Sequence, residues 1–257
     1  MASTMTEQTG TEKQAAGAVV QAREITRVYG EGETAVHALN GCSVAVDRGA
    51  LTAVMGPSGS GKSTMMHILA GLDRPTEGNV SIEGIDITTL NDNELTKLRR
   101  EHIGFIFQFF NLLPMLTAEE NIRLPLELAG GKIDKEWVDE VIKRTGLDDR
   151  RTHRPSELSG GQQQRVAIAR ALVSRPTVIF ADEPTGNLDS ATSGEILDLL
   201  SEMVADFGQT IVMVTHDARA AAIADRILFL ADGCIVKELK GADQGEIVAA
   251  MDAVGRQ

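Results

Sequence analysis

One short stretch, residues 56–64, constrains this chain more than any other part of its sequence. It satisfies the pattern G-x-x-x-x-G-K-[ST], in which glycines let successive backbone N–H groups turn inward around an anion. An apolar run over residues 51–55 precedes it and a helix-like stretch over residues 62–70 follows it, the strand–loop–helix context that the pattern requires. We therefore expect a phosphate-binding loop made of Gly56, Pro57, Ser58, Gly59, Ser60, Gly61, Lys62, Ser63 and Thr64.

Two residues of this loop have specific expected roles. The amino group of Lys62 would reach the β- and γ-phosphates of a nucleotide, and the hydroxyl of Ser63 would bind Mg²⁺. The first turn of the following helix would add unpaired N–H groups and the positive end of its dipole. The loop alone identifies neither the nucleotide nor the work that the nucleotide drives.

The composition excludes several other classes of protein. With 257 residues, 42% of them hydrophobic and 24% charged, the chain is typical of globular proteins with a large core. Its formal net charge of −12 argues against a nucleic-acid partner. No apolar run approaches the roughly 18 residues of a membrane span, and the amino terminus lacks the basic and apolar segments of a signal peptide. Cys42 and Cys234 are expected to be reduced thiols.

The pattern of turns and apolar runs divides the chain into regions. We expect a disordered leader over residues 1–18, one domain over residues 19–240 and a tail over residues 241–257 that contains a short helix. Short strands at residues 19–29, 34–39 and 43–46, separated by glycine turns, indicate an antiparallel layer near the amino terminus. Over about residues 109–157 the sequence pattern is typical of helices, and we interpret this region as an inserted helical lobe.

The rest of the domain alternates apolar strands with helices. Continuous apolar runs at residues 103–107, 178–181 and 210–215 are typical of parallel strands that are covered on both faces. Amphipathic helices are expected at residues 161–173 and 193–207. The predicted fold is α/β: a P-loop NTPase core with a mostly parallel sheet, an amino-terminal antiparallel β layer and an inserted α-helical lobe.

A pair of acidic residues, Asp182 and Glu183, directly follows the apolar run over residues 178–181. A carboxylate at the end of a buried parallel strand, beside a phosphate loop, is placed to hold Mg²⁺. We therefore expect Asp182 to be a metal ligand and Glu183 to polarise an attacking water. In isolation, an Asp-Glu pair at a strand end is more often a solvated turn, and the upstream loop favours the functional interpretation.

The stretch over residues 158–165 (Leu-Ser-Gly-Gly-Gln-Gln-Gln-Arg) resembles the signature sequence of ATP-binding cassette (ABC) ATPases. Physically it is a serine and two glycines at the start of a helix, so the chain has a second helix amino terminus that favours the binding of an anion. The resemblance implies a head-to-tail dimer, in which the signature of one copy covers the γ-phosphate held by the loop of the other. It assigns ATP contacts to Ser159, Gly160, Gly161 and Gln162.

The same resemblance, which covers about residues 20–240, implies roles for five further residues. Tyr29 matches the aromatic residue that stacks on adenine, although its position alone indicates a half-buried residue at a strand end. Gln108 matches the glutamine that senses Mg²⁺ and the attacking water. Asp189, with the two residues before it, matches the loop that crosses the dimer interface and contacts ATP. His216 matches the switch histidine at the γ-phosphate, and Glu183 matches the catalytic glutamate, as general base or as a water-orienting dipole.

The resemblance extends to one branch of the family. Residues 104–108, 111–114 and 183–190 are similar to those of macrolide-exporter and lipoprotein-release ATPases. That branch implies a permease partner with few membrane spans and a large extracytoplasmic domain, and hence a location on the cytoplasmic face of the membrane. Phe109 departs from the branch, where a small residue is frequent, and no permease is fused within the sequence, so we expect a separately encoded one.

The groove for the permease is expected near residues 108–126, where residues 109–116 carry a dense apolar set; the alternative is that this set fills the core of the helical lobe. Two other functions would use the same ATPase activity. It could regulate an envelope hydrolase or a sensor through a permease-like partner, or it could act in DNA repair or translation. The single cassette, the two scattered cysteines and the negative charge disfavour the last class.

Overall fold

The computed structural model describes residues 17–130 and 132–255. The expected leader therefore lies outside the described residues up to residue 16, and Ala18 already begins the first strand. A six-stranded sheet forms the centre of the molecule, in the order β10-β9-β3-β8-β7-β6. Its strands are β3 (Leu51–Met55), β6 (Ile103–Phe107), β7 (Val178–Asp182), β8 (Thr210–Val214), β9 (Arg226–Ala231) and β10 (Cys234–Lys240).

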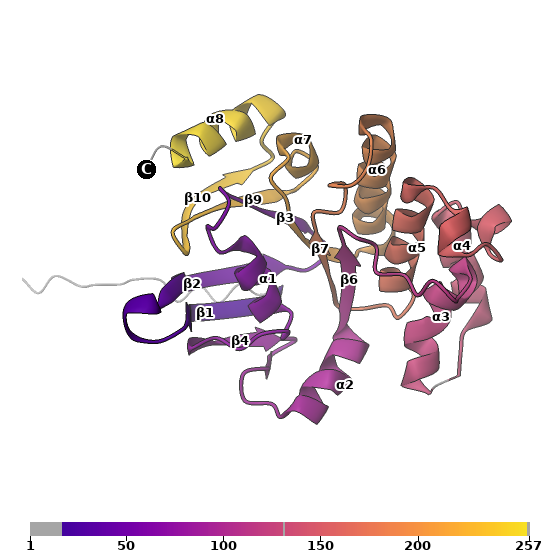
Figure 1. Ribbon diagram of the computed structural model, residues 1–257, viewed down its shortest axis with the longest axis horizontal. Coiled ribbons are helices and arrows are strands. Elements are labelled where there is room, and N and C mark those ends of the chain that lie inside the picture. The colour runs from indigo at the N-terminus through magenta and orange to yellow at the C-terminus, as the bar shows by residue number, and fades with distance from the viewer. Residues whose placement is uncertain (1–16, 131, 256–257) are drawn as a thin grey trace, which may run out of the picture.

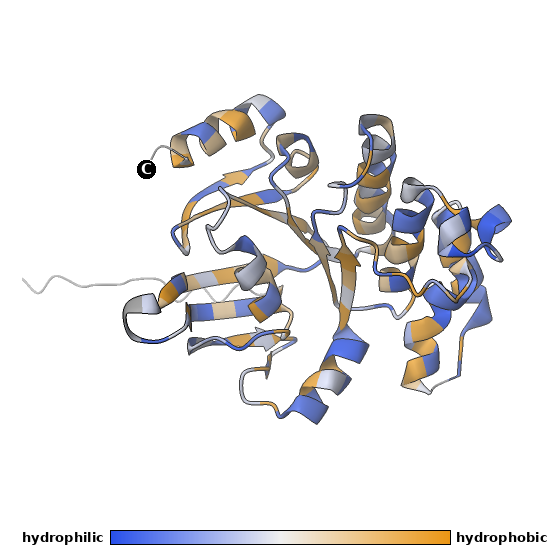
Figure 2. Cartoon of the chain, viewed as in Figure 1, coloured by the Kyte–Doolittle hydropathy of each residue, from blue (hydrophilic) through white to orange (hydrophobic). Residues whose placement is uncertain are grey.

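All neighbours in this central sheet pair in parallel, except that β10 runs antiparallel to β9 at one edge. Strands β3 and β8 are buried at every position, and they are hydrophobic along most of their length (Figure 2). Helices cover both faces of such a sheet, which explains why these strands are continuous apolar runs and do not alternate. The predicted mostly parallel core is confirmed.

A second, fully antiparallel sheet of order β2-β1-β4-β5 packs beside the first (Figure 1). It confirms the expected antiparallel layer, but the layer also includes a hairpin that follows the phosphate loop in sequence. The strands are β1 (Ala18–Tyr29), β2 (Val36–Asp47), β4 (Glu77–Ile82) and β5 (Ile85–Asp86). A core shared by both sheets lies between them, with Ile25, Leu39, Val54 and Leu228 among its buried members.

The expected break between strands at residues 39 and 43 was wrong, because β2 is one continuous strand. The pairing of β1 with β2 shifts register between Ile25, which faces Cys42, and Arg27, which faces Leu39. The one extra residue on β2 is accommodated around Gly41, whose φ of 67° favours glycine. A bulge bends a strand but lets its pairing continue on both sides, so what reads as a turn in the sequence stays within the sheet.

Eight α-helices complete the described part of the chain: α1 (Lys62–Leu69), α2 (Asp92–His102), α3 (Ala118–Ala129), α4 (Lys135–Arg144), α5 (Gly160–Leu172), α6 (Ser190–Phe207), α7 (Ala218–Ala221) and α8 (Gln244–Val254). Short 3-10 turns lie at Gly32–Thr34, Asp148–Arg150 and Pro155–Glu157. Two helices differ from the sequence prediction: α6 begins at Ser190 because Asp189 caps it, and the short helix α7 was not predicted.

Helices α3 and α4 lie at one end of the molecule and pack against α5, away from the antiparallel sheet (Figure 1). A capping box at Thr117 starts α3, which continues through Pro125, and Asp134 caps α4. Helix α4 buries Val138, Val141 and Ile142 in the main core. None of the helices within residues 17–130 and 132–255 is long and apolar enough to cross a membrane.

Truncation of Ile142 to alanine should destabilise the protein by about 2–5 kcal/mol, because the side chain is fully buried and its removal leaves a cavity. The matched control is Leu128→Ala on α3, whose side chain is 69% exposed and whose loss should cost less than about 0.5 kcal/mol. Urea denaturation followed by circular dichroism measures both. Equal effects of the two variants would contradict the packing of α4 described above.

Candidate nucleotide site

Four neighbouring parallel strands end at one edge of the central sheet, and each delivers predicted site residues there. Strand β3 leads into the phosphate loop, β8 leads to His216, β7 ends in Asp182 and precedes Glu183, and β6 ends just before Gln108. Since β3, β8, β7 and β6 are consecutive in the sheet, residues that lie far apart in the sequence share one edge. The carboxyl edge of an open parallel sheet is where such folds bind ligands.

The phosphate loop is held in a conformation that requires its glycines. Gly56, Gly59 and Gly61 have φ values of 151°, 79° and 100°. A Cβ atom on Gly56 would lie 2.1 Å from the Leu230 carbonyl oxygen, and one on Gly61 would lie 2.3 Å from the Ala38 carbonyl oxygen. The first and last glycines are therefore fixed by close backbone approach as well as by φ, and no other residue type fits there without rearrangement.

The amino end of α1 is open to an anion. Its N-cap is Gly61, which has no side chain to accept a hydrogen bond from the first turn. The first N–H groups of a helix have no partner within the helix, and the dipole adds positive potential at the same end. The start of α1 therefore has the donors and the potential that a phosphate needs.

Lys62 has the behaviour expected of a lysine beside a phosphate site. Its Nζ donates to the carbonyl oxygens of Gly56, at 2.9 Å, and of Pro57, at 2.8 Å, so the side chain folds back over the loop. Burial lowers the pKa of Lys62, and the nearby carboxylates of Glu183 and Asp182 oppose that shift. A partly desolvated ammonium that is held by two carbonyl oxygens gains more from a phosphate than a solvated one does. The residues therefore fit a nucleotide.

Asp182 and Glu183 differ in their surroundings although they are adjacent. Burial, and then the charge of Glu183, raise the pKa of Asp182, while His67 and Lys62 act in the opposite direction. Glu183 has a φ of 45°, an uncommon value for a residue with a side chain. Its N–H donates to the Val214 carbonyl oxygen on β8 at 2.9 Å, which holds this conformation in place. Backbone strain of this kind occurs often at functional sites.

The carboxylate of Glu183 is bound by the end of β8. One oxygen accepts hydrogen bonds from the His216 backbone N–H at 3.1 Å and from His216 Nδ1 at 2.7 Å. The other oxygen accepts the hydroxyl of Thr215 at 3.2 Å. The Glu183 side chain is 17% exposed and that of His216 is 73% exposed. The structure thus brings together two of the three residues predicted to act in catalysis, Glu183 and His216, and it adds Thr215, for which the sequence carries no signal.

Gln108 and Asn187 bind each other through their amides. Gln108 Nε2 donates to Asn187 Oδ1 at 3.2 Å, and Asn187 Nδ2 donates to the Gln108 carbonyl oxygen at 2.9 Å. Gly186 permits the approach, because a Cβ there would lie 2.9 Å from Gln108 Nε2.

Asp189 caps α6 by accepting the N–H groups of Ala191 and Thr192, both at 3.0 Å. A hydrogen bond from the Thr192 hydroxyl is the largest cause that lowers the pKa of Asp189.

The signature residues begin α5. Ser159 Oγ accepts the Gln162 N–H at 3.2 Å, and Gln162 Oε1 accepts the Ser159 N–H at 2.9 Å, a capping box that occupies both side chains. Gly161 packs against α6, since a Cβ there would lie 2.4 Å from Thr192 Cγ2. Helices α5 and α1 lie apart in the molecule (Figure 1). One chain therefore does not bring its own signature to its own phosphate loop.

Tyr29 lies at the end of β1 and is 40% exposed. Its hydroxyl donates to Asp73 Oδ2 at 2.7 Å, and the guanidinium carbon of Arg27 lies 4.4 Å from the ring centroid. These partners could not be predicted from the sequence, because Asp73 is remote from Tyr29 in the chain and belongs to no recognisable motif. The aromatic residue is thus exposed, as stacking on a base requires, and is fixed by polar contacts at its edge and on one face.

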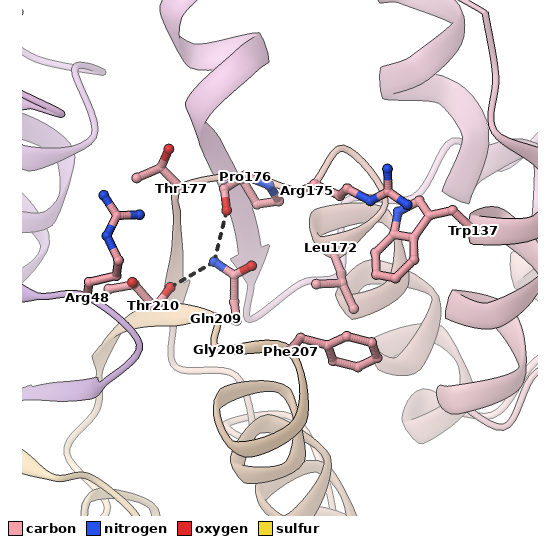
Figure 3. Close-up of a pocket in the computed structure, with 10 residues that line it drawn as sticks. All are labelled: Arg48, Trp137, Leu172, Arg175, Pro176, Thr177, Phe207, Gly208, Gln209 and Thr210. Carbon is pink, nitrogen blue, oxygen red and sulfur yellow. Dashed lines mark hydrogen bonds between the residues drawn. The ribbon is translucent and has the colours of Figure 1, made fainter.

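A separate hollow lies at the opposite edge of the sheet, where Thr177 precedes β7 and Thr210 begins β8 (Figure 3). Arg48 and Arg175 border it, and the Gln209 side chain inside it donates to the carbonyl oxygens of Pro176 and Thr210. It contains none of the predicted site residues. Since it lies at the amino ends of the strands, it is not the ligand edge of this fold.

Comparison with known proteins places the chain. The family model described as ABC transporter matches residues 39–186. The chain belongs to the ABC transporter family, as an ATP-binding cassette. It is 46% identical, over 88% of its length and 99% of the relative's, to the uncharacterized ABC transporter ATP-binding protein MJ0796 of Methanocaldococcus jannaschii. It is 42% identical to the lipoprotein-releasing system ATP-binding protein LolD of Legionella pneumophila, over 84% of its own length and 96% of the relative's.

A macrolide export ATP-binding/permease protein, MacB of Rhodopseudomonas palustris, is 48% identical over 87% of the cassette but only 34% of MacB itself. The structure resembles that of a dimeric post-hydrolysis state of MJ0796 bound to ADP and Pi, with a TM-score of 0.78 and 45% identity, over 87% of this chain and 99% of the other. These likenesses confirm the predicted fold and the predicted branch of the family. The cassette is an ATPase subunit of a transporter.

Proposed function

We propose that two copies of this cassette close on ATP in a head-to-tail dimer, hydrolyse it and reopen, and so drive a separate membrane permease. The observation that carries the proposal is the meeting of Lys62, Asp182, Glu183 and His216 at the ends of consecutive parallel strands. The separation of α5 from α1 supports a site shared by two chains, and a close relative has been solved as a dimer with ADP and Pi.

The roles of the site residues follow from their geometry and chemistry. Residues 56–64 would hold the phosphates and Tyr29 would stack on adenine. Ser159, Gly160, Gly161 and Gln162 of the second copy would cover the γ-phosphate, with Asp189 at the interface. Since both side chains of the capping box are already occupied within α5, the contacts from this segment would come mainly from its backbone N–H groups and from the free donors of Ser159 Oγ and Gln162 Nε2.

Mg²⁺ would be held by the Ser63 hydroxyl, by Asp182 and through Gln108, and when bound it would neutralise charge on the phosphates. No group of three or more His, Cys, Asp or Glu side chains suited to a metal occurs within residues 17–130 and 132–255. Such a site would therefore be completed by nucleotide oxygens, as Mg²⁺ prefers. Because burial raises the pKa of Asp182, the bound cation would also keep that carboxylate ionised.

The surface for the permease lies beside Gln108. Phe109 is 73% exposed, Met115 is 65% exposed and Leu113 is 40% exposed. The alternative that this apolar set fills the helical lobe is therefore wrong for these three residues, whereas Leu112 does pack against the core. Exposed apolar side chains that gather in one segment mark a contact surface. We propose that the permease binds there, on the cytoplasmic face of the membrane, and that it has few spans and a large extracytoplasmic domain.

Replacement of Phe109 by serine should reduce the amount of permease that the cassette retains from solubilised membranes by about tenfold, because a large exposed aromatic side chain would lose its buried contact area. Affinity capture followed by quantitative mass spectrometry measures this. Val248→Ser is the matched control: Val248 is 45% exposed on α8, which lies apart from β6 and the helices that follow it (Figure 1). Equal capture by both variants would refute the docking surface, and the identity of the captured protein would define the cargo or signal.

A further inference from the structure

Two polar side chains fix the orientation of the Tyr29 ring. Asp73 Oδ2 accepts the phenol hydroxyl at 2.7 Å, and the guanidinium of Arg27 lies over one face of the ring. Arg27 Nη2 also donates to Asp73 Oδ1 at 2.9 Å, so the three side chains form a closed triangle of contacts. One face of the ring is covered, and the opposite face is the one that remains for stacking.

The triangle is partly shielded from water. The side chains of Arg27 and Asp73 are 23% and 26% exposed, and Asp73 Oδ1 additionally accepts the N–H of Arg74 at 2.8 Å. Arg27 Nε is buried and has no hydrogen-bond partner within the described residues. A buried donor without a partner costs stability. The arginine is therefore placed for its contacts with Tyr29 and Asp73 and not for the best solvation of its own side chain.

The triangle is tied to the phosphate loop by two routes. Asp73 lies just beyond the carboxyl end of α1, whose amino end is the phosphate loop, and its N–H donates to the His67 carbonyl oxygen. On the neighbouring strand, Tyr29 pairs with Val36, and Ala38, two positions further along β2, approaches Gly61. A helix and a strand are stiff over these lengths. The position of the Tyr29 ring relative to the phosphates is thus set by rigid elements.

We propose that Arg27 and Asp73 are positioning residues, which hold Tyr29 in the one orientation that stacks on a nucleobase while the phosphates occupy residues 56–64. The proposal rests on the proposed function, which assigns adenine to Tyr29. A Tyr29 ring that was free to rotate would be oriented for stacking only part of the time. The apparent affinity for the nucleotide would then be reduced by that fraction. The nucleotide would complete a stack of guanidinium, phenol ring and base, in which the cation and the base take opposite faces of the ring.

The test compares a ligand that has a base with one that lacks it. ADP and inorganic pyrophosphate are titrated separately into the full chain with Mg²⁺, by isothermal calorimetry. Asp73→Asn and Arg27→Leu should each weaken ADP binding by about two- to tenfold, the range for a side chain that must be ordered on binding. Pyrophosphate binding should not change. In a Tyr29→Ala background, Asp73→Asn should have no further effect on ADP.

Asp92→Asn is the matched control. Its carboxylate also pairs with an arginine, Arg74 at 3.3 Å, but it is almost fully exposed and does not touch Tyr29. Unchanged or tighter ADP binding in Asp73→Asn, or equal weakening of ADP and pyrophosphate, would overturn the proposal. If Tyr29→Ala itself left ADP affinity unchanged, the assignment of the base site would fail as well. If Tyr29→Ala weakened ADP binding while Asp73→Asn left it unchanged, only the positioning role would be refuted.

Discussion

Replacement of Glu183 by glutamine is expected to abolish steady-state ATP hydrolysis while ATP still binds. The amide has nearly the same shape, so its oxygen can still accept from His216 while its NH2 group donates to the Thr215 hydroxyl oxygen, and the fold should not change. What is lost is the negative charge that polarises or deprotonates the attacking water, a contribution of about 10²–10⁴-fold in rate. Release of inorganic phosphate measures the rate, and calorimetry with ATP measures the retained binding.

The same variant tests the two-chain site. With hydrolysis blocked, ATP and Mg²⁺ should hold two copies together, so gel filtration should show a shift from monomer towards dimer. The control is Glu140→Gln on α4, a glutamate whose partner is Arg144 and which lies far from the strand ends. Full turnover by Glu183→Gln would remove this residue from the chemistry. A monomer at saturating ATP would contradict the head-to-tail arrangement.

Replacement of Lys62 by alanine is expected to abolish detectable nucleotide binding. The Lys62 ammonium is now held by two carbonyl oxygens, and a triphosphate would replace them with charged acceptors. Hydrogen bonds to charged groups are worth about 1.5–3 kcal/mol each, so the loss of one or two should weaken ATP binding by about tenfold to more than ten-thousandfold. Because burial lowers the pKa of Lys62, binding of a phosphate should also raise that pKa again.

Calorimetric titration of ATP into Lys62→Ala measures this loss, with Lys237→Ala as the control. Lys237 lies on β10 and is exposed, and its replacement by alanine removes the same charge from the protein. Circular dichroism establishes that both variants fold. Unchanged ATP affinity in Lys62→Ala would refute the phosphate-loop assignment, and equal weakening in both variants would indicate a long-range effect of net charge and not a contact.

Much of the fold could be predicted because its signals are local. The capping box at Thr117 links two residues that are three positions apart in the chain, and the structure shows both of its hydrogen bonds. The apolar runs at residues 178–181 and 210–215 were recognisable as covered parallel strands because both of their faces are buried. Patterns of this kind depend on neighbours in the chain, and a sequence displays those directly.

The errors of prediction have two causes, a distant strand in one case and a local helix cap in the other. Strand β2 continues past Gly41 because β1 pairs with it on both sides of the bulge. The sequence of β2 alone does not predict this pairing. Helix α6 starts at Ser190 because the Asp189 side chain turns back to cap it. The ends of elements are set by such competing contacts, so a periodic pattern locates them only approximately.

The phosphate loop, the acidic pair and the signature stretch were determined by the sequence alone, because each is a local arrangement whose chemistry requires particular residue types. Only the tertiary structure decided what surrounds them: that β8 delivers His216 and Thr215 to Glu183, that Asn187 holds Gln108, and that Asp73 and Arg27 hold Tyr29. The physical reason is that hydrogen bonds between side chains depend on distances in space. The order of strands in a sheet fixes those distances, and the spacing of residues in the chain does not.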